Sequence, residues 1–114
     1  MNSIKLKIGD SLSWKIDYKQ SDNITGVNLI GFEVIVKAIN KFNSQDFLFN
    51  ISSNDIDSNK YIEFINRSSG IFSIIIKNTS QFKKGEYFVD IEYIDSEGFK
   101  TSSKSITLKV QERV

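Results

Sequence analysis

The sequence predicts an all-β protein, an antiparallel β-sandwich of seven to eight short strands. Apolar residues recur at every second position in several short segments, which is the period of a half-buried strand. Turn-forming Gly, Asp, Asn and Ser residues separate these segments at intervals of about 8–12 residues, as in an antiparallel sandwich. No long segment shows helical spacing. Because 114 residues are enough to enclose one core, we expect a single domain over residues 1–114.

Four strands are expected in the first half of the chain, over residues 4–8, 12–18, 32–38 and 46–51. In each of them apolar side chains recur at every second position, so that one face of the strand is apolar. For the fourth strand, the apolar face that we expect consists of Phe47, Phe49 and Ile51.

The second half of the chain predicts strands over residues 61–66, 70–78 and 87–93, and a last strand that ends at Val110. The register of the segment 70–78 is open, because either of two sets of side chains could face the core: Phe72, Ile74 and Ile76, or Ile71 and Ile75. In the segment 87–93 the inward set is clearer and consists of Tyr87, Val89, Ile91 and Tyr93. A turn at residues 95–98 follows, in which Gly98 is free to adopt a positive φ.

The core must hold without a disulfide, because the chain contains no cysteine. Large inward side chains are expected to form it, with each aromatic ring burying roughly 150–250 Å². The predicted core residues are Trp14, Phe32, Tyr87 and Ile91. Tyr87 begins the penultimate strand, where immunoglobulin-like sandwiches have their tyrosine corner. The expected fold is therefore an immunoglobulin-like β-sandwich. Proline is absent, so lysines such as Lys5, Lys7 and Lys109, or a partner chain, must protect its edge strands.

The composition argues against an enzyme. The chain has no histidine, which removes the usual general base near neutral pH and the commonest metal ligand. Its six glycines are scattered, so no phosphate-binding loop is expected. Catalytic residues, metal ligands and cofactors are therefore expected to be absent.

Charge and hydropathy also exclude some partners. Fifteen basic and fourteen acidic residues are scattered along the chain, so we expect no nucleic-acid partner. The N-terminal residues contain no apolar stretch of signal-peptide or membrane-span length. We therefore expect synthesis in the cytoplasm, no signal peptide and no membrane span.

One pair of carboxylates has two interpretations, a catalytic pair or a solvated charged face. Asp90 and Glu92 should project from the same face of a strand about 7 Å apart, near the carboxylate separation of glycosidases. We favour a solvated charged face beside Lys100 and Lys104 on the neighbouring strand, because two carboxylates at this spacing are not a specific motif.

A second acidic pattern has the spacing of a calcium-binding loop. Asp55, Asp57 and Asn59 would occupy the first, third and fifth positions of such a loop. Lys60 stands at the sixth position, where glycine is required, and Asn66 stands at the twelfth in place of glutamate. An ordinary polar loop is therefore favoured.

Several short motifs occur in an order that resembles a known family. They are Gly9-Asp10-Ser11-Leu12-Ser13-Trp14, Asn28-Leu29-Ile30-Gly31-Phe32, Gly70-Ile71-Phe72-Ser73-Ile74, Gly85-Glu86-Tyr87-Phe88-Val89-Asp90-Ile91, and Asp95-Ser96-Glu97-Gly98 followed by Thr101. This order resembles the small immunoglobulin-like domain of tailed-phage virion proteins, as in the N-terminal domain of baseplate upper proteins. The resemblance covers about residues 4–112 and rests on strand and turn residues. Ser11 and Ile30 depart from it, since the family has threonine at both positions.

The resemblance implies a non-enzymatic structural or attachment module of a phage tail, baseplate or tail fibre. Such a module would be located in the virion after synthesis in the host cytoplasm. Its partners would be copies of itself or other phage tail proteins, and we expect a homo-oligomer in the assembled particle.

The alternation also predicts which apolar side chains point outward. The candidate interaction surface consists of Ile35, Ile39, Ile71, Ile75 and Phe88. Single exposed apolar residues are normal, but Ile35 and Phe88 are expected on one sheet and could form a contact patch there. The alternative function is a carbohydrate-binding or adhesin module that binds a cell-surface glycan on rings such as Phe42, Phe88 or Phe99. A bacterial surface repeat is a more distant alternative.

Overall fold

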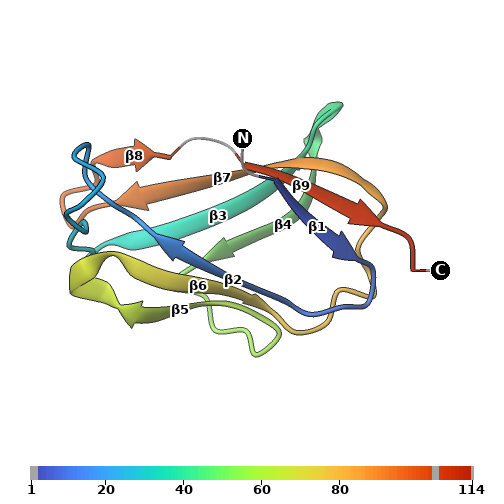
Figure 1. Cartoon of the computed structure of the whole chain (residues 1–114), viewed down its shortest axis with the longest axis horizontal. Helices are drawn as coiled ribbons and strands as arrows, with labels where there is room; N and C mark the ends of the chain where they lie inside the picture. The colour runs from blue at the N-terminus through green and yellow to red at the C-terminus, as the bar shows by residue number, and fades with distance from the viewer. Residues whose placement is uncertain (1–2, 104–105, 114) are drawn as a thin grey trace.

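Two sheets stacked face to face form a β-sandwich in the computed structural model, which describes residues 3–103 and 106–113 (Figure 1). The larger sheet has the order β1 (Ser3–Lys7), β9 (Ile106–Gln111), β7 (Gly85–Ile94), β3 (Glu33–Asn40) and β4 (Asn43–Ser52), and β8 (Lys100–Ser102) also pairs with β7. The smaller sheet has the order β2 (Leu12–Asp17), β6 (Ile71–Ile76) and β5 (Lys60–Asn66). A short 3-10 helix, η1 (Arg67–Ser69), connects β5 to β6.

The predicted sandwich without a disulfide is confirmed, with two differences in detail. The described residues contain nine strands, because β7 pairs with two successive segments, β8 at its C-terminal end and β9 at its N-terminal end. The larger sheet is mixed, because β1 runs parallel to β9 while its other pairs are antiparallel. β1 and β9 lie at opposite ends of the sequence, so no local pattern reports the direction in which they pair.

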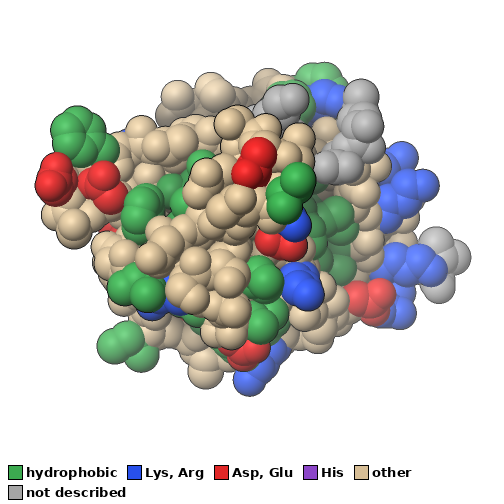
Figure 2. All heavy atoms as spheres, turned by 60° about the vertical axis from the view of Figure 1, so that its left-hand side comes forward, with side chains coloured by type: hydrophobic (Ala, Val, Ile, Leu, Met, Phe, Trp, Pro, Cys, Tyr) green, Lys and Arg blue, Asp and Glu red, His purple; other side chains and the backbone are tan. Residues whose placement is uncertain are grey.

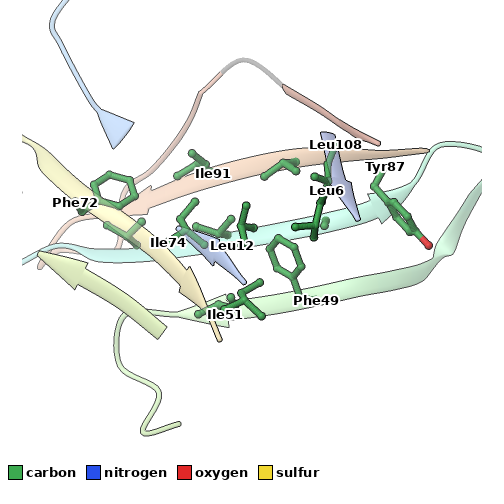
Figure 3. Packing of buried hydrophobic residues seen from close by; sticks show 14 of the residues in the cluster. Leu6, Leu12, Phe49, Ile51, Phe72, Ile74, Tyr87, Ile91 and Leu108 are labelled. Atoms are coloured by element: carbon green, nitrogen blue, oxygen red, sulfur yellow. The ribbon is translucent and has the colours of Figure 1, made fainter. Parts of the chain in front are cut away.

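The core is one cluster of apolar side chains between the two sheets (Figure 3). Tyr87 and Ile91 are each 1% exposed in this cluster. Trp14 and Phe32, also predicted for the core, are only partly buried and pack against its margin. Trp14 lies on the edge strand β2, and Phe32 precedes β3, so neither side chain is covered on all sides.

The register of β6 answers the question that its sequence leaves open. Phe72, Ile74 and Ile76 are completely buried in the core, whereas Ile71 and Ile75 are partly exposed on the outer face of the smaller sheet.

The tyrosine corner expected at Tyr87 is confirmed. The Tyr87 hydroxyl donates a hydrogen bond of 2.9 Å to the backbone carbonyl of Lys83. At the other end of β7, the Asp95 carboxylate accepts hydrogen bonds from the backbone N–H groups of Glu97 and Phe99 at 2.9 and 3.0 Å. Gly98 in the same turn has a φ of 91°, as expected. Both ends of the longest central strand are therefore fixed by side-chain hydrogen bonds.

Candidate interaction surface

An apolar row crosses the outer face of the larger sheet. Phe47 on β4 lies opposite Ile39 on β3, and Ile39 lies opposite Phe88 on β7. Directly opposed residues of neighbouring strands have Cβ atoms about 4.5–5.5 Å apart, so the three side chains are adjacent. Phe47 and Phe88 expose 48% and 38% of their surface, with a half-buried Ile39 between them. We call these three residues the Phe47–Phe88 row.

Phe47 reaches this face because β4 contains a β-bulge. Phe49 lies opposite Ala38 and faces the core, whereas Phe47 lies opposite the next residue of β3, Ile39, so that Leu48 is an extra residue. A bulge inverts the alternation beyond it. The expectation that Phe47 shares the inward face of Phe49 is therefore wrong. The sequence does contain a signal for this bulge, because the three consecutive apolar residues Phe47, Leu48 and Phe49 break the alternation.

Polar and charged residues border the Phe47–Phe88 row on both sides. On one side, the Lys41 ammonium lies 5.5 Å from the centre of the Phe88 ring, and Glu86 lies opposite Lys109. On the other side, Lys37 lies opposite Asp90. An apolar centre with a polar rim is the usual anatomy of a protein–protein interface.

Ile35 lies on the same outer face, beyond the polar residues that include Lys37. It is opposite Glu92 on β7, so Ile35 and Phe88 belong to one sheet, as the sequence predicts. The Lys37 ammonium separates Ile35 from the apolar row because it reaches Glu92, at 2.8 Å from the carboxylate. Ile35 is therefore a neighbour of the row and not a continuous part of it.

Ile71 and Ile75 lie on the other layer of the sandwich. Ile75 on β6 is flanked by Ser13 on β2 and Tyr61 on β5, on the outer face of the smaller sheet. The five predicted surface residues are therefore divided between two opposite faces. The structure brings together Ile39 and Phe88, adds Phe47, and places Ile71 and Ile75 elsewhere.

Glu92 is held as a carboxylate by two lysines. Its oxygens lie 2.8 Å from the Lys37 ammonium and 3.1 Å from that of Lys100, and its side chain is 12% exposed. The hydrogen bonds from Lys37 and then Lys100 lower the pKa of the Glu92 carboxyl below its usual value. A glycosidase general acid needs a raised pKa, so this environment suits a structural charge and not a proton donor. Lys104, the other lysine expected here, lies outside the described residues.

The acidic residues of the loop before β5 bind backbone groups. Asp57 accepts hydrogen bonds from the N–H groups of Asn59 at 2.8 Å and Lys60 at 3.2 Å, which lower the pKa of its carboxyl. Asp55 accepts a hydrogen bond of 2.9 Å from the N–H of Ser52. Within residues 3–103 and 106–113, no group of three or more acidic side chains is placed to hold a metal ion.

The three rings considered for glycan binding do not form one platform. Phe42 is 84% exposed in the β3–β4 hairpin, next to Lys41, whose ammonium lies over the Phe88 ring. Phe99 is 69% exposed in the β7–β8 turn, at the far end of β7. Figure 2 shows one face of the molecule, on which hydrophobic side chains lie among polar and charged ones. Phe42 and Phe88 therefore share one end of the sheet, and Phe99 lies at the other.

Comparison of the sequence with protein-family models finds no matching family, and a search of curated proteins finds no similar sequence. The part of the chain that the structure describes includes no helix with the length and apolar character that a membrane crossing requires.

Proposed function

We propose that this domain is a non-enzymatic protein-docking module of a tailed-phage virion, in the tail, baseplate or tail fibre. The observation that carries the docking role is the Phe47–Phe88 row on the outer face of the larger sheet. The virion context rests on the order of sequence motifs that resembles the immunoglobulin-like domains of phage virion proteins.

The Phe47–Phe88 row has the features of a binding centre. Aromatic side chains are enriched among the residues that dominate binding energy, and two of the three residues are phenylalanines. Neighbouring strands of a hydrogen-bonded sheet hold the row, so little conformational entropy would be lost when a partner binds. The ion pairs of Glu92 add a polar margin on the same face.

Electron microscopy tests the virion role. Gold-labelled antibody against the domain should bind to the tail structure of the phage particles produced by cells that express the gene. Detection of the domain only as free protein in infected cells, with unlabelled particles, would overturn the virion role.

Substitutions test the docking face. Phe88→Ser should reduce the amount of this chain in purified particles about tenfold or more, because truncation of a central interface aromatic costs about 2 kcal/mol. Phe99→Ser is the matched control, because Phe99 is an exposed ring at the far end of β7, and its particles should contain a normal amount. Equal incorporation of both variants would show that the docking surface lies elsewhere.

Carbohydrate binding is the second candidate, and the position of Phe42 and Phe88 at the same end of the larger sheet favours it. Exposed rings can bind the apolar face of a sugar, and these two lie at the same end of the sheet. A glycan array should then show binding that Phe42→Ala and Phe88→Ala both abolish. An array without signal would count against this role and leave protein docking as the function of the face.

A further inference from the structure

The strand β2 is an open edge of the smaller sheet. Within the described part of the chain it pairs with β6 in an unbroken register from Leu12 to Asp17. The edge strands β1, β4 and β5 have features that discourage pairing with another chain. β1 carries the exposed lysines Lys5 and Lys7, and the pairings of β4 and β5 contain register shifts. β2 has no such shift, and its two exposed charged side chains, Lys15 and Asp17, are of opposite sign.

The direction of the backbone groups on β2 follows from one hydrogen bond. The N–H of Tyr18 donates to the carbonyl of Gly70, just before β6, at 2.9 Å. Backbone groups alternate in direction along an antiparallel strand. The N–H and C=O groups of Ser13, Lys15 and Asp17 therefore point away from β6, toward the free edge. Their side chains are exposed on the outer face of the sheet.

The inner side of this edge is apolar and incompletely covered. Trp14 and Ile16 are partly buried, and they line an open groove together with Ile4 of β1 and Ile106 of β9. A strand added beside β2 would cover these side chains while its backbone pairs with the free edge.

We propose that β2 pairs antiparallel with β2 of a second copy of this chain, around a two-fold axis at Ile16. In this register Lys15 lies opposite Asp17 of the second copy, and Asp17 lies opposite its Lys15. Opposite charges in directly facing positions stabilise an antiparallel pair. On the inner side, Ile16 would face its symmetry mate, and Trp14 would face Tyr18 of the second copy. The product is a continuous sheet with the order β5-β6-β2-β2-β6-β5 and an isologous interface.

The charges select this register over its neighbours. Two neighbouring registers keep the side chains on the same face, and they have the two-fold axis at Lys15 or at Asp17. They place Lys15 opposite Lys15 or Asp17 opposite Asp17, and like charges destabilise the pair. Registers that differ from the proposed one by a single residue would turn the side chains of one strand to the wrong face. In the free domain Asp17 lies 3.6 Å from the Lys19 ammonium, and its side chain is exposed on the outer face like that of Lys15.

This contact is independent of the proposed virion role. It uses the edge of the smaller sheet, whereas the Phe47–Phe88 row lies on the face of the larger one. Loss of virion docking and loss of self-association can therefore be observed separately.

Sedimentation of the purified domain over a range of concentrations tests the pairing by charge exchange. The unmodified chain should form dimers that weaken with added salt. Lys15→Asp and Asp17→Lys should each weaken dimerisation about tenfold or more, because each substitution alters two symmetry-related pairs. The double variant, Lys15→Asp with Asp17→Lys, should restore it. Glu63→Lys, at an exposed position of β5 in the same sheet, is the control and should leave dimerisation unchanged. A monomer at millimolar concentration, or a double variant that remains as weak as the single ones, would overturn the proposal.

A cysteine at the two-fold axis tests the register directly. Because the chain contains no cysteine, any disulfide of a single-cysteine variant must join two copies. Residues in the position of Ile16 would have Cα atoms about 4.5 Å apart, within the range of a disulfide. Ile16→Cys should therefore be cross-linked on mild oxidation. Ser13→Cys should not, because the two Ser13 positions would be about 20 Å apart along the strands. Cross-linking of Ser13→Cys in place of Ile16→Cys would contradict this register.

Discussion

The hydroxyl of Tyr87 illustrates how one atom can stabilise a loop between the two sheets. The ring of Tyr87 is buried in the core, and its hydroxyl binds the backbone carbonyl of Lys83, four residues earlier. The chain between β6 and β7 is therefore fixed just before it enters β7. Figure 3 shows Tyr87 at one end of the core with its oxygen pointing away from the other apolar side chains.

Tyr87→Phe should lower the free energy of unfolding by about 1 kcal/mol, because it removes this hydrogen bond and preserves the ring. Urea unfolding should show a lower midpoint with an unchanged slope. Tyr61→Phe is the control, because Tyr61 is only partly buried, on the outer face of the smaller sheet, and its substitution should change stability by less than about 0.5 kcal/mol. Equal midpoints for Tyr87→Phe and the unmodified chain would mean that the hydrogen bond does not contribute.

Arg67 is a second residue with a large structural role, and the sequence did not indicate it. Its guanidinium donates hydrogen bonds to the carbonyls of Leu29 and Phe32 at 3.2 and 2.9 Å and lies 3.8 Å from the centre of the Phe64 ring. The planar guanidinium can form both kinds of contact at once, which lysine cannot. The side chain thereby attaches the loop before β3 to the end of β5. The two carbonyls that accept its hydrogen bonds lie far away in the sequence, so no local pattern pointed to this role.

At the level of the strands, alternation predicted most of the fold. The inward faces of β2, β3 and β7 are read directly from the sequence, because each strand has one apolar and one more polar side. Two kinds of information are missing from such a pattern. Pairing between distant strands, such as β1 with β9, depends on tertiary packing. A bulge such as that at Leu48 inverts the alternation without a change in composition, and it moves Phe47 from the predicted inward face to the outer face of the larger sheet.

The close approach between the β2–β3 loop and the end of η1 depends on Gly70. This residue ends η1 in the left-handed conformation, with φ of 75°, and a Cβ atom there would lie 2.6 Å from the Tyr18 carbonyl oxygen and 2.7 Å from that of Val27. Gly31 is a useful comparison, because its φ is 84° but a Cβ atom would meet no other atom within 4 Å.

Gly31→Ala should therefore cost about 1–2 kcal/mol, the penalty of a left-handed backbone for a residue with a Cβ atom. Gly70→Ala should cost about 2 kcal/mol more, because the added methyl group also collides with two backbone carbonyls. Chemical unfolding of both variants measures the difference. A similar loss of stability in the two would show that the loop can move away from η1 at little cost.

At the level of the whole molecule, the two proposed contacts use different parts of the sandwich. The Phe47–Phe88 row lies on the outer face of the larger sheet, and the free edge of β2 belongs to the smaller sheet. A dimer through β2 would therefore leave the Phe47–Phe88 row of each copy accessible, so that the dimer could dock onto two partner sites. Such bivalent binding would be stronger than either contact alone wherever the spacing of the partner sites matches.

The stability of the whole domain should fall in acid, because the folded state favours several ionised carboxylates. Hydrogen bonds from the Thr25 hydroxyl and from the backbone of Ile24 and Thr25 lower the pKa of Asp22 from 3.8 to about 2. The pKa values of Asp57 and Glu92 are also lowered. The unfolded chain, with ordinary pKa values, therefore binds more protons than the folded one as the pH falls below about 4.5. The stabilisation from these carboxylates is complete above about pH 4.5 and is lost as the pH falls through their pKa values in the folded state.

Glu92 gives this prediction a specific test, because its lysine partners are known and its side chain is mostly buried. Glu92→Gln should be less stable than the unmodified chain near neutral pH, since the two ammonium groups lose their carboxylate. The difference in free energy of unfolding should shrink as the pH approaches about 2, because protonation removes the same charge from Glu92. Glu97→Gln, in the exposed β7–β8 turn, is the matched control and should differ little from the unmodified chain at any pH. A difference for Glu92→Gln that stays constant down to about pH 2 would show that packing, and not the ion pairs, accounts for the contribution of Glu92.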